Sequence, residues 1–468
     1  MGEKNRPAAP KTRRPIRKSH GTTRTENLLS GLCDCAFLQL WSYANPHKDD
    51  GHELCDLLAV FDKHVFVFFD REKAFPDETT PHTRISWERW KREAIERQVR
   101  TLGGAVKYIK SGREIFLDPR RQRPLPLSFD RSTSNYYKIL VAHGVEAAIQ
   151  GASDENVTGS LAVSYGAPSD DIDLPFVVNL DKDDPVHVLD SSTLPVILGE
   201  LDTIFDLSNY FAAKEEAVRS LQGVFYCGEE DLLAHYFMNF DEDSNRHFIG
   251  VEDESPTHLM IAEGWWRDFE QSVVYQKTKL ANEVSYLWDE LIQKTCAHSL
   301  GGTLLGNCDG FDRSSPISEM AREPRFSRRA LSRTMSNAIG DFPSDADSIW
   351  RWVSFMPSYY SDQGYVFLQL WVPFRIRGHE YRGKRRRILE IACGAAKVKW
   401  PHLTKVIGIA MDAPKHAIEN SEDFLAMDCR DWSEAEYAEY RHLNRDFEFF
   451  EKPQMHITER SVSEFVNE

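Results

Sequence analysis

Two apolar runs separated by a short charged break constrain this chain more than any other feature. Residues 57–61 read Leu-Leu-Ala-Val-Phe and residues 65–69 read Val-Phe-Val-Phe-Phe, with Asp-Lys-His at 62–64. Short runs rich in β-branched and aromatic residues favour buried strands, and a short polar break between them favours an antiparallel hairpin. Asp56 precedes the first run and Asp70 follows the second. The stretch therefore predicts a buried hairpin with a carboxylate at each end.

Length and composition set the broad class. The chain has 468 residues, 41% of them hydrophobic, which suffices for two or three domains with packed cores. A net charge of −16 argues against general coating of nucleic acid and against binding to an anionic membrane. No apolar run approaches the length of a membrane span, and the eight cysteines are dispersed as reduced core cysteines are. We expect a cytoplasmic protein, or a nuclear one in a eukaryote, with no membrane partner.

The first region has a regular order of expected elements. Thr23 followed by Glu26 resembles a capping box at the start of a helix over 24–36. The apolar run 37–41 predicts a strand, and the hairpin supplies two more. Apolar residues at helical spacing predict a second helix over about 86–102, and residues 136–142 predict a further strand. The expected order is helix, strand, strand, strand, helix, strand.

The remaining composition divides the chain further. We expect a mixed α/β protein with these parts: a basic disordered arm, 1–23; the first domain, 24–150; a helix-rich α+β region, 151–300; a basic Gly/Ser/Arg linker or loop, 301–345; and a small α/β region, 346–468. Residues 1–25, which include the arm, hold eight Lys/Arg against one acid, and the linker clusters arginines over 322–333. Both segments are candidates for contacts with phosphate groups.

The acids of the first region suit a metal ion. Phosphodiester cleavage needs two or three oxygen ligands around Mg²⁺, which neutralises developing charge and activates a water. Asp56 opens one hairpin strand, Asp70 closes the other, and Glu26 lies in the first turn of the preceding helix. These three carboxylates are the predicted Mg²⁺ ligands. A role of Glu26 in the capping box alone is the alternative.

Residues 24–145 resemble the PD-(D/E)xK restriction-endonuclease-like superfamily, in its Mrr and NERD-type branches. The resemblance rests on Glu26, on DLLAVF from Asp56, and on VFVFFDREK, which ends at Lys73. It implies an endonuclease-like α-β-β-β-α-β core and Mg²⁺-dependent hydrolysis, with Lys73 orienting the attacking water. In some branches a glutamine of the following helix belongs to the site, and Gln98 lies on that helix.

One spacing departs from that pattern. The family separates its acid and its lysine by one residue, so that both lie on one face of the strand. In this chain Glu72 stands two residues after Asp70, and Lys73 comes one later. A β-bulge after Asp70 would bring Lys73 onto the face of Asp70. The predicted site therefore depends on such a bulge.

The last region raises a second chemistry. RILEIACGAAK at 387–397, KVIGIAMD at 405–412 and DFLAMDC at 423–429 resemble the opening of a Rossmann-type S-adenosylmethionine methyltransferase. The resemblance implies a strand running into a Gly-rich turn, with Glu390, Gly394, Asp412 and Asp428 near the cofactor. A buried strand, turn and helix without a cofactor is the alternative.

Together these features predict a nucleic-acid-directed protein, favouring DNA over RNA, that is a Mg²⁺-dependent nuclease or a relative that binds without cleaving. A non-catalytic interaction scaffold and a methyltransferase-like C-terminal region are the alternatives. Protein partners stay open.

Overall fold

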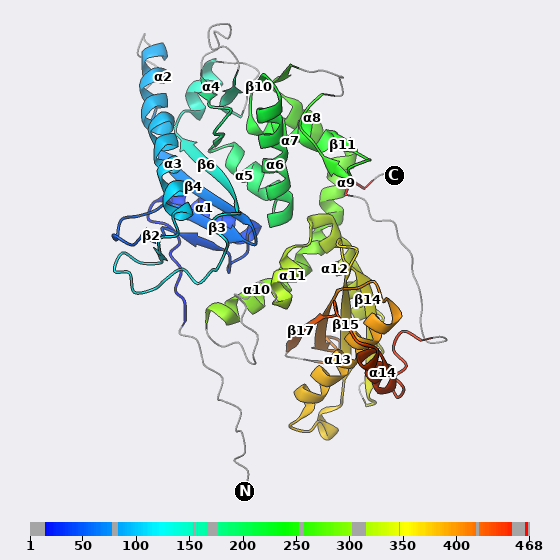
Figure 1. Cartoon of the computed structure of the whole chain (residues 1–468). Helices are drawn as coiled ribbons and strands as arrows, with labels where there is room; N and C mark the ends of the chain where they lie inside the picture. The colour runs from blue at the N-terminus through cyan, green and yellow to red at the C-terminus, as the bar shows by residue number, and fades with distance from the viewer. Residues whose placement is uncertain are drawn as a thin grey trace. The chain divides into compact units, whose positions relative to one another are not determined.

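The chain folds into two compact units, residues 14–276 and residues 277–468 (Figure 1). The computed structural model describes residues 15–76, 83–152, 156, 158–166, 176–251, 257–301, 315–345, 347–417, 421–451 and 464–466. The mixed α/β class predicted from the sequence is confirmed. Within these residues, no helix combines the length and the apolar character needed to cross a membrane.

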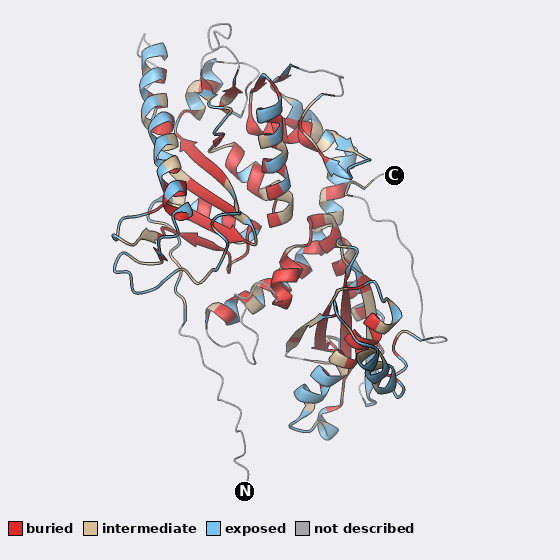
Figure 2. Cartoon of the chain, in the orientation of Figure 1, coloured by how far each residue is buried: buried red, intermediate tan, exposed pale blue. Residues whose placement is uncertain are grey.

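A five-stranded sheet forms the centre of the first unit, with the strand order β1-β3-β4-β6-β9. Its strands are β1 (Ser42–Ala44), β3 (Leu57–Phe61), β4 (His64–Glu72), β6 (Asn135–His143) and β9 (His187–Asp190). β1, β3 and β4 pair antiparallel, whereas β6 is parallel to β4 and β9 is parallel to β6. Figure 2 shows β3, β4 and β6 as largely buried strands.

Helices connect and cover these strands. They are α1 (Arg24–Ala36), α2 (Thr83–Lys91), the π-helical turn η1 (Arg92–Glu96), α3 (Arg97–Lys110), α4 (Glu146–Ala152), α5 (Thr193–Glu200) and α6 (Ile204–Ser220). α1 packs on β1, β3 and β4, and α3 packs on β4 and β6. Because a parallel strand needs a crossover connection, the continuous helix α2–η1–α3 is what returns the chain from β4 to β6. The helices expected over 24–36 and 86–102 and the strands expected in the hairpin and over 136–142 are observed, with the short strands β2 (His47–Lys48) and β5 (Ile115–Phe116) added between them.

The hairpin forms as predicted, but its turn is shorter. Phe61 pairs with His64, so only Asp62 and Lys63 lie in the turn. Asp62 has a φ of 53°, in the left-handed region that two-residue hairpin turns require and that aspartate tolerates. All of β3 is buried, as are residues 65–68 of β4.

The strand expected over 37–41 is wrong. These residues follow the C-terminus of α1 in a turn, and the strand begins only at Ser42. Phe37 and Leu40 are fully buried, and the ring of Phe37 lies 4.7 Å from that of Phe66 on β4. The run is apolar because the turn packs against the hairpin. From sequence alone, such a short apolar run cannot be distinguished from a strand.

The expected boundary at residue 150 is also wrong, since β9 completes the sheet begun by residues 42–143. A second sheet of the same unit has the order β13-β10-β7-β8. Its strands are β7 (Ala162–Tyr165), β8 (Val177–Leu180), β10 (Gly223–Tyr226) and β13 (His258–Ile261), and the helices near it are α7 (Glu229–Met238) and α8 (Trp265–Glu270). Two short ribbons pair β2 (His47–Lys48) with β5 (Ile115–Phe116) and β11 (Phe240–Asp241) with β12 (Arg246–His247).

The described part of the expected arm, residues 15–23, is docked rather than disordered. The Lys18 side chain is 7% exposed, and its ammonium lies 2.5 Å from the Asp34 carboxylate of α1 and 3.0 Å from the Gln39 carbonyl oxygen. Because burying a lysine requires a paired charge, Asp34 holds this segment against the domain. Residues 1–14 lie outside the described residues.

The second unit is built on a four-stranded sheet with the order β14-β15-β16-β17. Its elements are α9 (Val273–Asn282), which begins in the first unit, η2 (Glu283–Ser285), α10 (Tyr286–Leu300), α11 (Pro316–Ala321), α12 (Arg325–Gly340), β14 (Trp350–Pro357), β15 (Gln363–Trp371), η3 (Phe374–Ile376), α13 (Tyr381–Lys399), β16 (Lys405–Asp412), β17 (Glu422–Asp428) and α14 (Glu434–Leu443). β15 and β16 pair parallel, and the two outer pairs are antiparallel.

Both units contain the same succession of pairings. In each, an antiparallel hairpin (β3–β4 or β14–β15) is followed by a helix and then by a strand parallel to the second hairpin strand (β6 or β16). The sequence shows no internal repeat, because burial constrains only the apolar character of such strands and not their identity.

The expected linker at 301–345 is wrong for its described part. Residues 316–321 and 325–340 are helices. Arg325 and Arg328 donate to the two carboxylate oxygens of Asp289 at 2.6 and 2.5 Å, and Arg328 is fully buried. Buried arginines need paired acids, so these two side chains are engaged within the unit and are not free for phosphate groups.

The methyltransferase-like reading of 387–397 is overturned by the fold. The expected strand and Gly-rich turn both lie within α13. Gly394 is in mid-helix, where a Cβ atom would overlap the ring of Tyr440 on α14. Gly394 therefore permits close packing of two helices. Asp412 accepts hydrogen bonds from Arg385 at 2.8 Å and Arg377 at 3.4 Å, which leaves it engaged within the unit.

This packing predicts that replacement by alanine has opposite effects on stability at two glycines of α13. Gly394→Ala should lower the free energy of unfolding by about 1 to 3 kcal/mol, because the added methyl group overpacks the contact with Tyr440. A Cβ atom at Gly383 would have open space around it. Gly383→Ala should therefore raise the free energy of unfolding by about 0.5 to 1 kcal/mol, because alanine favours the helix. Denaturant unfolding of both variants measures the difference. Stabilisation by both substitutions would contradict the packing role of Gly394.

Candidate functional site

The carboxyl ends of three parallel strands bring polar side chains to one edge of the first sheet. Asp70 pairs in register with Val141, Glu72 with His143, and Asp190 with Ala142. Residues that pair directly lie side by side, so the ends of β4, β6 and β9 coincide. In open α/β sheets this edge is where ligands bind.

Asp56 lies where β3 begins, beside Asp70. Its Oδ2 accepts a hydrogen bond of 2.6 Å from the Asp70 backbone N–H. Burial raises the pKa of Asp56 to about 7, although the Asp70 N–H opposes this, and the charges of Glu53, Glu26 and Asp70 add to the rise. The structure thus brings Asp56 and Asp70 together, as predicted, with Glu26 within electrostatic reach.

Glu26 is occupied at the N-terminus of α1. Its Oε2 accepts hydrogen bonds from the Thr22 N–H and hydroxyl, both 2.7 Å, and from the Asn45 side chain at 3.1 Å. Burial would raise the pKa of Glu26, but these hydrogen bonds lower it overall. Asn45 also donates to Glu53 at 2.6 Å. The capping function therefore accounts for the position of the Glu26 carboxylate.

Asp70 faces a histidine that the sequence analysis missed. The Asp70 side chain is 0% exposed, and His143 Nε2 lies 2.8 Å from its Oδ1, off the direction of a hydrogen bond. His143 Nδ1 lies 2.7 Å from the Ser191 hydroxyl. Burial lowers the pKa of His143, but Asp70 outweighs burial and the net pKa is raised. The raised pKa favours an imidazolium beside a buried carboxylate.

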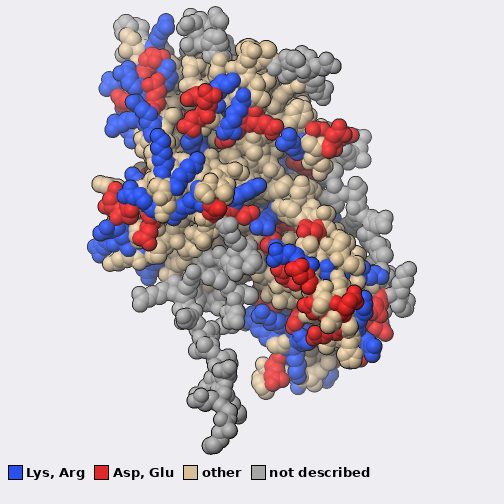
Figure 3. All heavy atoms as spheres, in the orientation of Figure 1, with Lys and Arg blue, Asp and Glu red and all other residues tan. Residues whose placement is uncertain are grey.

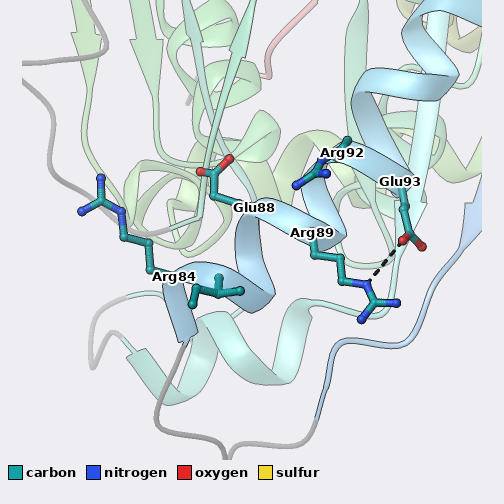
Figure 4. A pocket seen from close by; sticks show the side chains of 6 residues that line it. Arg84, Glu88, Arg89, Arg92 and Glu93 are labelled. Carbon is teal, nitrogen blue, oxygen red and sulfur yellow. Dashed lines mark hydrogen bonds and ion pairs between the residues drawn. The ribbon is translucent and has the colours of Figure 1, made fainter.

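Lys73 pairs with Glu93 of η1, whereas Asp70 faces His143. The Lys73 ammonium lies 2.7 Å from Glu93 Oε2, and Glu93 also pairs with Arg89 at 3.5 Å (Figure 4). The Lys73 side chain is 35% exposed, and Lys73 and Arg89 lower the pKa of Glu93. Glu93 belongs to the wall of a shallow pocket of about 480 Å³ on α2 and η1.

The bulge on which the predicted site depends is absent from the described strand β4. β4 and β6 pair one to one from His64 to Glu72, without an inserted residue. Asp70 and Glu72 therefore share a face, and Glu72 takes the position that the lysine has in the endonuclease pattern. Glu72 contributes to the raised pKa of His143.

Gln98 lies half-buried on α3. Among the described residues, no hydrogen bond joins its side chain to Asp56 or Asp70. The structure does not bring this predicted residue into the site.

These residues do not fit a Mg²⁺ ion. Mg²⁺ demands near-octahedral oxygen ligands, and two or more carboxylates must point at one position. Within the described part of the chain, no three or more His, Cys, Asp or Glu side chains are arranged to hold a metal ion. One oxygen of Asp56 already accepts the Asp70 N–H, and Asp70 faces His143. The predicted Mg²⁺ site is thus replaced by a carboxylate–imidazole contact.

A second buried acidic pair lies next to this edge. Glu230 accepts hydrogen bonds from the hydroxyls of Ser160 at 2.5 Å and Thr158 at 3.0 Å. Burial, with the nearby charge of Asp190, raises the pKa of Glu230 to about 8, and burial raises that of Asp190 to about 6. Asp190 and His143 were missed, although each is a polar residue at the end of a buried strand.

The raised pKa of Asp56 predicts a stability penalty that grows with pH. Between about pH 4 and 7 the unfolded chain releases the Asp56 proton while the folded chain keeps it, so stability falls as pH rises through this range. The free energy of unfolding of Asp56→Asn, relative to that of the wild type, should therefore be higher at pH 8 than at pH 5. Denaturant unfolding at both pH values measures the change.

Asp130→Asn is the matched control, because the side-chain hydroxyl of Ser132 lowers the pKa of Asp130 to about 2. Its effect on stability should be constant from pH 5 to pH 8. A constant effect of Asp56→Asn over the same range would contradict the raised pKa.

Comparison with known proteins adds no relative. No protein-family model, no curated protein and no solved structure matches this chain. Its function is therefore argued from the residues and their geometry.

Proposed function

We propose that this protein binds nucleic acid and is a non-cleaving relative of the PD-(D/E)xK endonucleases. The order α1, β1, β3, β4, α2–α3, β6 and the pairing of these strands support the relationship. The convergence of Asp56 and Asp70 at the edge of the sheet supports it further.

The observation that carries nucleic-acid binding is the charge of the crossover helix. Residues 83–110 contain eight Lys/Arg against three Glu, a net charge of +5, in a chain whose total charge is −16. Figure 3 shows Lys and Arg atoms gathered on the face of the molecule where α2 and α3 lie. A basic helix in an acidic protein marks a local surface for phosphate groups.

We propose that the protein does not cleave nucleic acid because of the residues around Asp70. A nuclease of this type needs a cation beside the acid and a lysine near the attacking water. In this chain His143 stands beside Asp70, and Lys73 is engaged by Glu93. The imidazolium can neutralise Asp70 but cannot supply the open ligand positions that activate water.

A metal-dependent nuclease and a scaffold without nucleic-acid binding are the competing functions. A metal-dependent nuclease requires Asp70 to exchange His143 for a metal ion. A scaffold without nucleic-acid binding leaves the positive charge of the crossover helix without a ligand. Both are decided by the two measurements that follow.

We predict that the purified full chain leaves supercoiled plasmid intact in Mg²⁺ or Mn²⁺. Asp70→Asn should give the same result as the wild type, because Asp70 holds no catalytic metal. Agarose electrophoresis measures nicking, and an established restriction enzyme in the same buffer serves as the control. Metal-dependent nicking that Asp70→Asn abolishes would show that the protein is an active nuclease.

We also predict that the protein binds oligonucleotides and loses affinity steeply with salt. Each phosphate contact contributes a slope of about −0.7 for single strands, or −0.9 for duplex, to the logarithmic dependence of affinity on salt. Fluorescence anisotropy from low to moderate salt measures this slope. No binding at low salt would favour the scaffold.

A further inference from the structure

A groove lies between α3 and α6 in the first unit. It has a volume of about 1170 Å³, and its floor is the start of β6, including Tyr136 and Lys138. α3 forms one wall and α6 the other. The volume slightly exceeds that of a site for one small molecule, which suits a short stretch of a single extended chain.

Each of the three acids that line the groove has a cationic partner within the protein. Three ion pairs account for them: Lys138 with Asp184 at 2.5 Å, Arg219 with Glu215 at 2.7 Å, and Arg246 with Glu216 at 3.3 Å. Glu215 also lies 3.4 Å from His187. The paired acids leave the positive charge of the α3 wall uncompensated.

Three cations of α3 line the groove at helical spacing. Arg100, Lys107 and Lys110 lie on one side of the helix and have no acidic partner among the described residues. Lys110 Nζ lies 4.7 Å from the centre of the Tyr136 ring. A row of cations beside an aromatic ring is the arrangement by which proteins hold single-stranded nucleic acid.

Two glycines lie between these cations on the same face. Gly103 and Gly104 are in the interior of α3, where glycine disfavours the helix. A Cβ atom at either position would have no neighbour within 4 Å, so internal packing does not require glycine there. The glycines leave the helix backbone bare at the wall of the groove, which permits close approach of a ligand.

We propose that this groove binds a single strand of nucleic acid. The phosphate groups lie against Arg100, Lys107 and Lys110, the strand passes over Gly103 and Gly104, and the Tyr136 ring lies beside the bases. The inference rests on the proposed nucleic-acid binding and adds its location and the form of the ligand.

The test uses the full chain and a fluorescent thymidine 20-mer, titrated at several salt concentrations. Lys107→Gln/Lys110→Gln should reduce the magnitude of the salt slope by about 1.4, because two phosphate contacts are lost. Lys384→Gln/Arg386→Gln removes two exposed cations from α13 in the other unit and should leave the slope unchanged.

The glycines give an independent readout that loss of folding cannot imitate. Gly103→Ala/Gly104→Ala should raise the melting temperature, because alanine favours the helix, while it weakens oligonucleotide binding about tenfold. Stronger folding with weaker binding separates ligand contact from structural damage. Unchanged affinity of this variant would show that the strand does not pass over the glycines.

The outcomes separate the two proposals. If the wild type binds and both groove variants match it, the groove is overturned while nucleic-acid binding stands. An equal loss in the α13 control would also overturn the groove. A stronger affinity for duplex than for single strand would overturn the form of the ligand. If the wild type binds no oligonucleotide, both proposals fail.

Discussion

The parallel pairing of β4 with β6 is the constraint on which the first unit depends. It runs without interruption from His64 paired with Asn135 to Glu72 paired with His143. Because parallel neighbours cannot be joined by a tight turn, the chain must cross over the sheet, and the helix of residues 83–110 is that crossover. The same pairing brings the carboxyl ends of both strands to one edge. It thereby sets the position of the acidic site and of the basic helix together.

Buried carboxylates at this edge are compensated locally. A carboxylate that leaves water needs a counter-charge, hydrogen bonds or a proton. Each solution occurs here: Asp70 faces His143, Glu26 accepts hydrogen bonds in the first turn of α1, and Asp56 retains its proton up to about pH 7. A metal ion would satisfy the same requirement in an active nuclease. In this chain His143 lies beside Asp70, and Lys73 pairs with Glu93 of the crossover helix.

The sequence predicted elements whose signal is local. The hairpin, the first helix with its cap at Thr23, and the crossover helix all follow from apolar spacing and turn chemistry. Errors arose where a short apolar run fits two structures. Residues 37–41 are a buried turn, and residues 387–397 are a helix, although both read as strands. The sequence shows that residues 322–333 are basic, but it does not show which acids pair with these arginines. Their partner Asp289 lies more than thirty residues away and was not predicted.

By itself, the sequence determined the mixed α/β class, the hairpin, and the proximity of Asp56 to Asp70, because antiparallel pairing across a short turn leaves little choice of register. Only the tertiary structure decided what surrounds these acids. His143 and Asp190 reach the edge through parallel strands distant in sequence, and the direction of Lys73 depends on the crossover helix packed beside it. The groove along α3 likewise exists only once α6 packs near it. Contacts across such separations are set by packing of the whole unit, which local spacing does not encode.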